Sequence, residues 1–154
     1  MAKAAGIILA LLTLIAPGCG GQSMTPSTTI DLSGTWSGVV GAGSGGGRAL
    51  RVTWSATQTG TTISGPATLT TSPAVSDLTF AGTLSGTVTR AQLSVRYVSN
   101  AGTIAGLPDC SVSGQGTGAA TPTSISGQLD VAFASCDALG MQAPTTDQFT
   151  LTKQ

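Results

Sequence analysis

The sequence predicts an all-β protein, a small antiparallel eight-stranded up-and-down barrel, with a β-sandwich as the alternative. From residue 31 onward, apolar residues alternate with Ser, Thr and Gln, which is the pattern of half-buried strands. No stretch of this part has convincing helical spacing of its apolar residues. Several connections are short, so strands that follow one another in sequence are expected to pair antiparallel. Eight such strands can close into a barrel.

Each expected strand has an apolar phase that would face the interior. Trp36 and Trp54 lie on this phase in the first and second strands, and Phe80, Tyr97 and Phe133 lie on it in later strands. These five aromatic residues are candidates for lining a ligand pocket, and plain core packing is the alternative, because small barrels are either filled or hold one small ligand. The strands are expected at 36–40, 50–57, 63–69, 80–88, 93–97, 112–116, 125–133 and 149–151.

The connections and the glycines also fit a closed sheet. Residues 59–61, 90–91 and 120–123 form short connections between expected strands. Ser-Gly pairs such as Ser85-Gly86 recur inside the strands, mostly with the glycine on the apolar phase. Glycine within a strand permits a sharp bend or the close approach of a neighbour, and a small closed sheet needs both.

Two cysteines test the strand order. Cys110 and Cys136 are centred on residue 123, inside an expected turn, so a hairpin folded there would bring their sulfur atoms together. An even pair of cysteines in an exported protein is typical of a disulfide. The alternative is a two-thiol metal site, but the sequence has no histidine to complete one.

The start of the first expected strand carries a family resemblance. Gly34-Thr35-Trp36-Ser37-Gly38 resembles the opening of lipocalin-like domains in small bacterial lipoproteins, and the resemblance spans roughly 31–153. It implies an eight-stranded up-and-down barrel. An outer-membrane pore is a further alternative, but aromatic residues are only 4% of the chain, too few for two membrane girdles.

The N-terminal segment predicts export. Lys3 precedes an apolar run at 4–16, and Pro17-Gly18-Cys19 closes it, which is the pattern of a signal peptide. The end of this segment, 15–19, resembles the bacterial lipobox. The resemblance implies that Cys19 is acylated and becomes the new N-terminus. Gly20 follows Cys19, and no aspartate stands there to retain the lipoprotein in the inner membrane. The resemblance therefore implies transport to the outer membrane of a Gram-negative host. The alternative is an ordinary secretory signal that leaves Cys19 as a thiol.

These observations divide the chain into a signal peptide (1–18), a polar tether (19–30) and one β-barrel domain (31–154). The expected partner is a membrane, reached through the lipid anchor, with a small hydrophobic ligand as a possible second partner. The part after residue 18 has five cations and six aspartates and no basic run. A nucleic-acid-binding protein needs a clustered basic face, so this function is not expected.

The side chains available for chemistry are few. The chain has no histidine and no glutamate, and its six carboxylates are aspartates, so we expect no enzyme and no cofactor. The glycine-rich stretch 41–47 lacks the Lys-Ser/Thr ending of a phosphate-binding loop. Asp109, Asp137 and Asp147 could share one end of a barrel, but they lack a calcium-loop motif, and no metal site is expected.

Two classes of function remain open. The first is a binding module that takes a small apolar or amphipathic ligand into the barrel. The second is a structural or protein-interaction module of the outer membrane with a solid core, in which the long connections 99–109 and 137–146 carry recognition.

Overall fold

The computed structural model describes residues 30–41, 49–71, 78–100, 109–137 and 144–154. Its regular structure consists of eight β-strands, in agreement with the number expected from the alternation of the sequence. Their lengths, from seven to eleven residues, are ordinary for strands. The strands are β1 (Gly34–Val40), β2 (Leu50–Thr59), β3 (Thr62–Thr71), β4 (Thr79–Thr89), β5 (Gln92–Ser99), β6 (Ser111–Ala120), β7 (Ser124–Ala134) and β8 (Thr145–Lys153).

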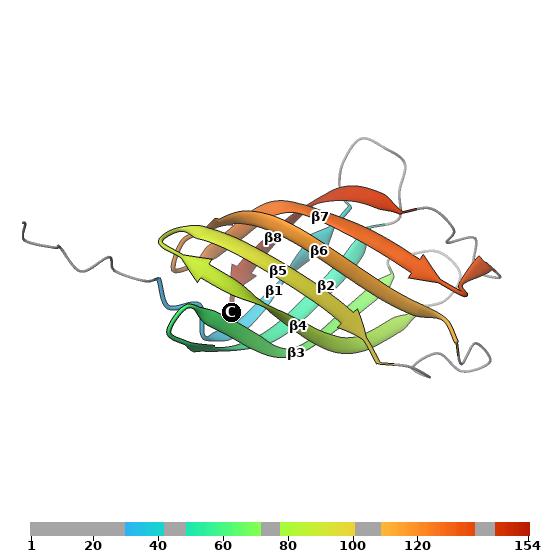
Figure 1. The fold of residues 1–154 in the computed structure, drawn as a ribbon, viewed down its shortest axis with the longest axis horizontal. Helices are drawn as coiled ribbons and strands as arrows, with labels where there is room; N and C mark the ends of the chain where they lie inside the picture. The colour runs from blue at the N-terminus through green and yellow to red at the C-terminus, as the bar shows by residue number, and fades with distance from the viewer. Residues whose placement is uncertain (1–29, 42–48, 72–77, 101–108, 138–143) are drawn as a thin grey trace, which may run out of the picture.

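The strands form a closed antiparallel barrel with up-and-down topology (Figure 1). Each strand pairs with its neighbours in sequence, and β1 pairs with β8 to close the sheet. The register places Trp36 directly opposite Trp54. The predicted barrel is therefore confirmed, and the sandwich alternative is wrong. Because the sheet closes, the strands that the structure describes have no free edge.

The apolar phase of each strand faces the interior. In β2, Leu50, Val52, Trp54 and Ala56 are all buried, and the residues between them are exposed. The same alternation in the other strands produces a continuous buried core inside the barrel. The phase assigned from the sequence is confirmed, because a period of two places every second side chain on the same face.

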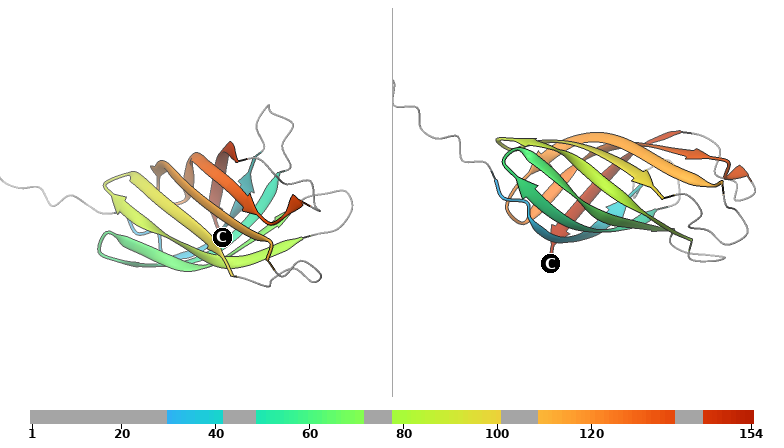
Figure 2. Two further views of the ribbon diagram at one scale, coloured as in Figure 1. Left: turned by 45° about the vertical axis from the view of Figure 1, so that its right-hand side comes forward. Right: turned by 60° about the horizontal axis from the view of Figure 1, so that its bottom comes forward.

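The two ends of the barrel differ (Figures 1 and 2). At one end, the base, short turns at 60–61, 90–91 and 121–123 join successive strands, as the sequence predicts. Ile30 lies at the base, where Gln58 donates to both its carbonyl and that of Gly60, and the C-terminus also lies there, because the N–H of Lys153 donates to the carbonyl of Thr123 in a base turn (Figure 1). At the opposite end, the disulfide end, Cys110 precedes β6 and Cys136 follows β7, and their sulfur atoms are bonded.

The segment before β1 closes the base. Leu32 is fully buried. Its N–H donates to Oε1 of Gln58 (2.8 Å), and its carbonyl accepts a hydrogen bond from Nε1 of Trp36 (2.8 Å). Nε2 of Gln58 donates to the carbonyl of Ile30 (3.0 Å). The ammonium group of Lys153 lies 5.6 Å from the centre of a Trp36 ring, in cation–π geometry. The chain that enters the barrel is therefore fixed across the base.

The β2–β3 hairpin shows why glycine is needed in this sheet. Gly60 lies in its turn with φ of +60°, a left-handed conformation that glycine adopts without steric cost. Gly65 lies so close to β2 that a Cβ there would be 1.8 Å from the carbonyl oxygen of Ser55. The next residue is Pro66, and the pairing of β2 with β3 is interrupted at this point. Proline has no backbone N–H, so its place in this gap costs no hydrogen bond to β2. The hairpin can therefore coil strongly enough to join a small barrel.

The outer surface is polar. In the described part of the chain, the large hydrophobic residues that are exposed are Val39 and Val98. The outward phase of the strands is otherwise mainly Ser, Thr, Gln and Arg, as expected for a wall that faces water. Among the described residues there is no helix that is both long and apolar enough to cross a membrane.

Candidate functional site

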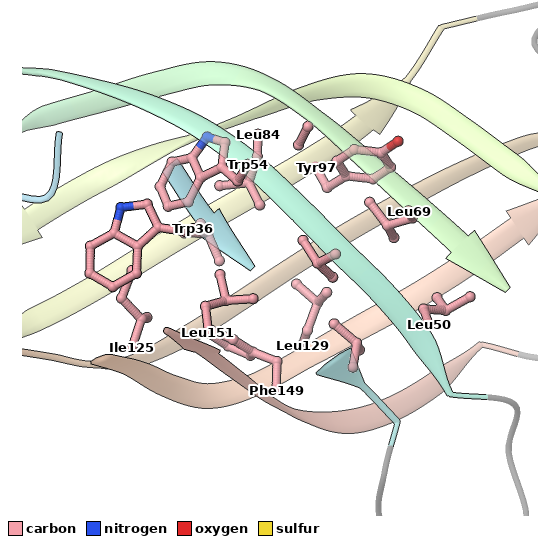
Figure 3. Packing of buried hydrophobic residues seen from close by; sticks show 14 of the residues in the cluster. Trp36, Leu50, Trp54, Leu69, Leu84, Tyr97, Ile125, Leu129, Phe149 and Leu151 are labelled. Carbon is pink, nitrogen blue, oxygen red and sulfur yellow. The ribbon is translucent and has the colours of Figure 1, made fainter. Parts of the chain in front are cut away.

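The five aromatic residues that are candidates for lining a ligand pocket all lie on the inward phase, but they do not form one site. Trp36, Trp54, Phe80 and Tyr97 are almost completely buried, whereas Phe133 is half-buried and packs against the core. Phe80 and Phe133 form an edge-to-face pair with 6.1 Å between ring centres. Trp36 lies near the base, with its ring turned toward Ile125 (Figure 3).

A small cavity lies inside the barrel, and only Trp54 and Tyr97 of the five aromatic residues line it. It offers about 20 Å³ to the centre of a water-sized molecule. About 10–15 Å³ on this measure accommodates one water, whereas typical ligand pockets have volumes of about 300–1,000 Å³. Leucine and valine side chains and Phe149 form the rest of the cavity lining, and Figure 3 shows Leu69, Leu84, Leu129, Leu151 and Phe149 packed in the interior. The interior is therefore packed, with room for about one small molecule the size of water.

The buried aromatic residues differ in how their polar atoms are satisfied. Nε1 of Trp36 donates to the carbonyl of Leu32, and the hydroxyl of Tyr97 donates to the carbonyl of Phe80 (2.7 Å). Nε1 of Trp54 is buried without a partner in the described part of the protein. The cavity surface is apolar, so this N–H does not provide a donor to it. Burial also raises the pKa of Tyr97 to about 12.

Among the described residues, the disulfide end contains the predicted cystine but no cluster of metal ligands. Cys110 and Cys136 are bonded, with their Cα atoms 4.8 Å apart. Asp109 and Asp137 are exposed beside them, and Asp147 lies within β8 and accepts a hydrogen bond from Thr145 (2.6 Å). Within the described ranges, no three residues of His, Cys, Asp or Glu are placed to hold a metal ion.

A polar groove crosses the outer wall of the barrel over β4 to β8, and we call it the outer groove. It contains about 570 Å³ of space open to solvent. Two parallel rows of outward-facing side chains line it, and within each row neighbours are cross-strand partners. The row nearer the disulfide end is Ser85, Arg96, Gln115, Asp130 and Thr146, and the row nearer the base is Thr87, Ser94, Thr117 and Gln128.

The floor of the outer groove is backbone rather than side chain. Between the two rows lie Gly86, Val95 and Gly116, which are also cross-strand partners and belong to the inward phase. A Cβ at Gly116 would lie 2.2 Å from the carbonyl oxygen of Gln128, so the close approach of β7 requires glycine there. Backbone is therefore directly accessible between the two rows of polar side chains.

Opposite charges lie on either side of Gln115 in the outer groove. Arg96 on β5 and Asp130 on β7 are each register partners of Gln115 on β6, and all three are exposed. Asp130 accepts a hydrogen bond from the hydroxyl of Thr146 (2.6 Å). A smaller hollow of about 160 Å³ adjoins the groove and shares Arg96, Gln115 and Asp130. The arrangement suits hydrogen bonding to a bound molecule, and Asp130 is the carboxylate that it presents.

Alternation alone does not reveal the outer groove. It places Arg96 and Asp130 on the polar phase, but the two are separated in sequence and meet only through the pairing of β5, β6 and β7. The signal that could find the groove is the register of three hairpins, which depends on the turn residues and the glycines. Gln58 and Leu32 at the base were missed for the same reason, since they join segments 26 residues apart.

Several sequence predictions fall outside the described residues. These are the signal peptide (1–18), acylation of Cys19, the tether up to residue 29, the glycine-rich stretch at 42–47, and most of the connections 99–109 and 137–146. They stay predictions.

The fold and the outer groove define a small, closed antiparallel β-barrel with a packed interior and a polar exterior. Comparison of the chain with protein-family models, with curated proteins and with solved structures gives no match. The functional argument therefore depends on this chain alone.

Proposed function

We propose that this protein is a lipid-anchored protein of the bacterial cell envelope whose barrel is a structural or interaction module with a solid core. The packed interior is the observation that supports the solid core and a role of the surface in recognition. A cavity of about 20 Å³ does not admit an amphipathic ligand, so the molecular surface is the part available for recognition. The polar outer wall, with Val39 and Val98 as its exposed large hydrophobic residues in the described ranges, supports a domain that works in water.

The position of Ile30 supports an orientation on the membrane. Cys19, the proposed lipid site, lies eleven residues before Ile30. Such a segment spans at most about 40 Å when fully extended. Because Ile30 is held at the base by Gln58, we propose that the base is the attached end and that the disulfide end points away from the membrane.

A small apolar ligand inside the barrel is the second candidate from the sequence. It would require the side chains around Trp54 and Tyr97 to move apart, because they leave too little space for it. The interior therefore favours the solid-core function.

The anchor is tested by lipid labelling. In cells fed radioactive palmitate, we expect the wild-type protein to carry the label and Cys19→Ser to lose it completely. Cys110→Ser is the matched control and should keep the label, because Cys110 forms a disulfide. Equal labelling of the wild-type and Cys19→Ser proteins would contradict the anchor and leave the conclusions about the barrel interior unaffected.

A further inference from the structure

The outer groove has the shape of a site for a linear molecule. Its two rows lie two residues apart along the strands, which corresponds to about 7 Å, and the longer row crosses five neighbouring strands, which corresponds to about 19 Å. The groove runs across the strands rather than along them. A chain of a few linked rings would fit lengthwise between the rows and contact both.

The chemistry of the outer groove matches hydroxyl groups. Arg96 offers only donors and Asp130 only acceptors, whereas Gln115, Gln128 and the Ser and Thr hydroxyls offer both. A hydroxyl group is both donor and acceptor, so it can pair with every one of these side chains. Hydrogen bonds to the guanidinium group and the carboxylate are the stronger ones. The groove residues include one cation and one carboxylate, so the groove has no net charge to attract a charged molecule.

Peptides and lipids fit the outer groove less well. A peptide that binds by adding a strand needs an unpaired sheet edge, and the described strands of this barrel have none. Apolar or aromatic anchors, which dominate protein interfaces, need an apolar pocket. The apolar side chain among the groove residues is Val95, which points into the core.

We propose that the outer groove binds an uncharged oligosaccharide, with Arg96 and Asp130 hydrogen-bonded to its hydroxyl groups. This inference goes beyond the envelope role proposed above and does not depend on the lipid anchor, because every groove residue belongs to the barrel. Binding is expected to be weak, in the millimolar range, because exposed polar side chains lose conformational freedom on binding and little apolar area is buried.

The test is a nuclear magnetic resonance titration of the purified, ¹⁵N-labelled full chain. The probes are cellotetraose, maltotetraose and chitotetraose, with tetragalacturonate and tetraalanine as the charged and the peptide probes. We expect at least one neutral tetrasaccharide to give saturable shifts of the backbone amides around Arg96, Gln115 and Asp130. Arg96→Ala and Asp130→Ala should each weaken that binding at least tenfold.

Arg51→Ala is the matched control. Arg51 is an exposed arginine on β2, in the wall opposite the outer groove, and its loss should leave binding unchanged. All three positions are exposed, so the variants should retain the wild-type amide spectrum away from the substitution. The proposal is overturned if no neutral probe binds, if the shifts map elsewhere, or if the groove variants bind like the wild type. It is also overturned if tetragalacturonate or tetraalanine binds the groove more tightly than every neutral probe.

Discussion

At the scale of single residues, the buried aromatic side chains show how polar atoms are accommodated in this core. Trp36 and Tyr97 each donate a hydrogen bond to a backbone carbonyl. Trp54 is equally buried, but its N–H has no partner among the described residues. An unsatisfied buried donor typically costs about 1–3 kcal/mol, which explains why the polar atoms of Trp36 and Tyr97 are both paired with backbone carbonyls.

Tyr97 gives a pH-dependent prediction. Burial raises its pKa to about 12, above the value of about 10 in an unfolded chain. Above pH 10 the unfolded chain therefore loses the phenolic proton first. The stability of the folded protein is therefore unaffected by this group below pH 10 and falls as the pH rises from 10 toward 12, because deprotonation then favours the unfolded chain.

The measurement is an ultraviolet titration of the folded protein, because Tyr97 is the one tyrosine in the sequence. We expect tyrosinate absorbance to appear with a midpoint well above pH 10. Tyr97→Phe should remove this part of the alkaline dependence and lower stability by about 1 kcal/mol at neutral pH, through loss of the bond to Phe80. A midpoint near pH 10 in the folded state would show that Tyr97 is solvated.

At the scale of the strands, the sequence predicts the inward face well and the ends less well. Eight alternating stretches gave eight strands, because a period of two is visible without knowing the pairing. β8 was expected around Phe149 and Leu151, yet it begins at Thr145. Residues 145–148 are all polar, so no apolar phase marks them, and their pairing with β7 makes them a strand.

Some features of the candidate sites could be predicted from the sequence, and others could not. Cys110 and Cys136 could be paired from the sequence, because the turn between them and their spacing are both local features. The aromatic residues were placed inside correctly, but the alternation could not decide between a pocket and a packed core. That decision depends on how Leu84, Leu129 and Phe149 fill the space across the barrel, which requires the pairing of all eight strands.

The disulfide is expected to stabilise the β6–β7 hairpin. Its cysteines are 26 residues apart, and loop entropy for that separation corresponds to about 3.5 kcal/mol. The double variant Cys110→Ala/Cys136→Ala should lose about this much in urea unfolding while still folding, because the β6–β7 ladder remains. Wild-type protein unfolded with reductant should match the double variant. Equal stability of the double variant and the oxidised wild type would contradict a stabilising disulfide.

At the scale of the whole molecule, closure of the sheet explains both the interior and the exterior. Pairing of β1 with β8 gives the apolar phases one shared interior, which they fill. It also leaves the outward phases as a mainly polar wall, on which the outer groove forms where cross-strand rows of side chains are separated by Gly86 and Gly116. In the proposed function, the barrel is a scaffold that presents its surface, with the base as its attachment to the membrane.

Native mass spectrometry of the protein, extracted gently from its host membrane, tests the packed interior most directly. The account predicts a mass equal to that of the processed polypeptide with its N-terminal lipid, and no further small molecule retained at one copy per chain. Absence of the lipid would contradict the proposed anchor at Cys19, but it would not contradict the packed interior of the barrel. An apolar molecule held stoichiometrically by the folded protein and released on unfolding would contradict the solid core.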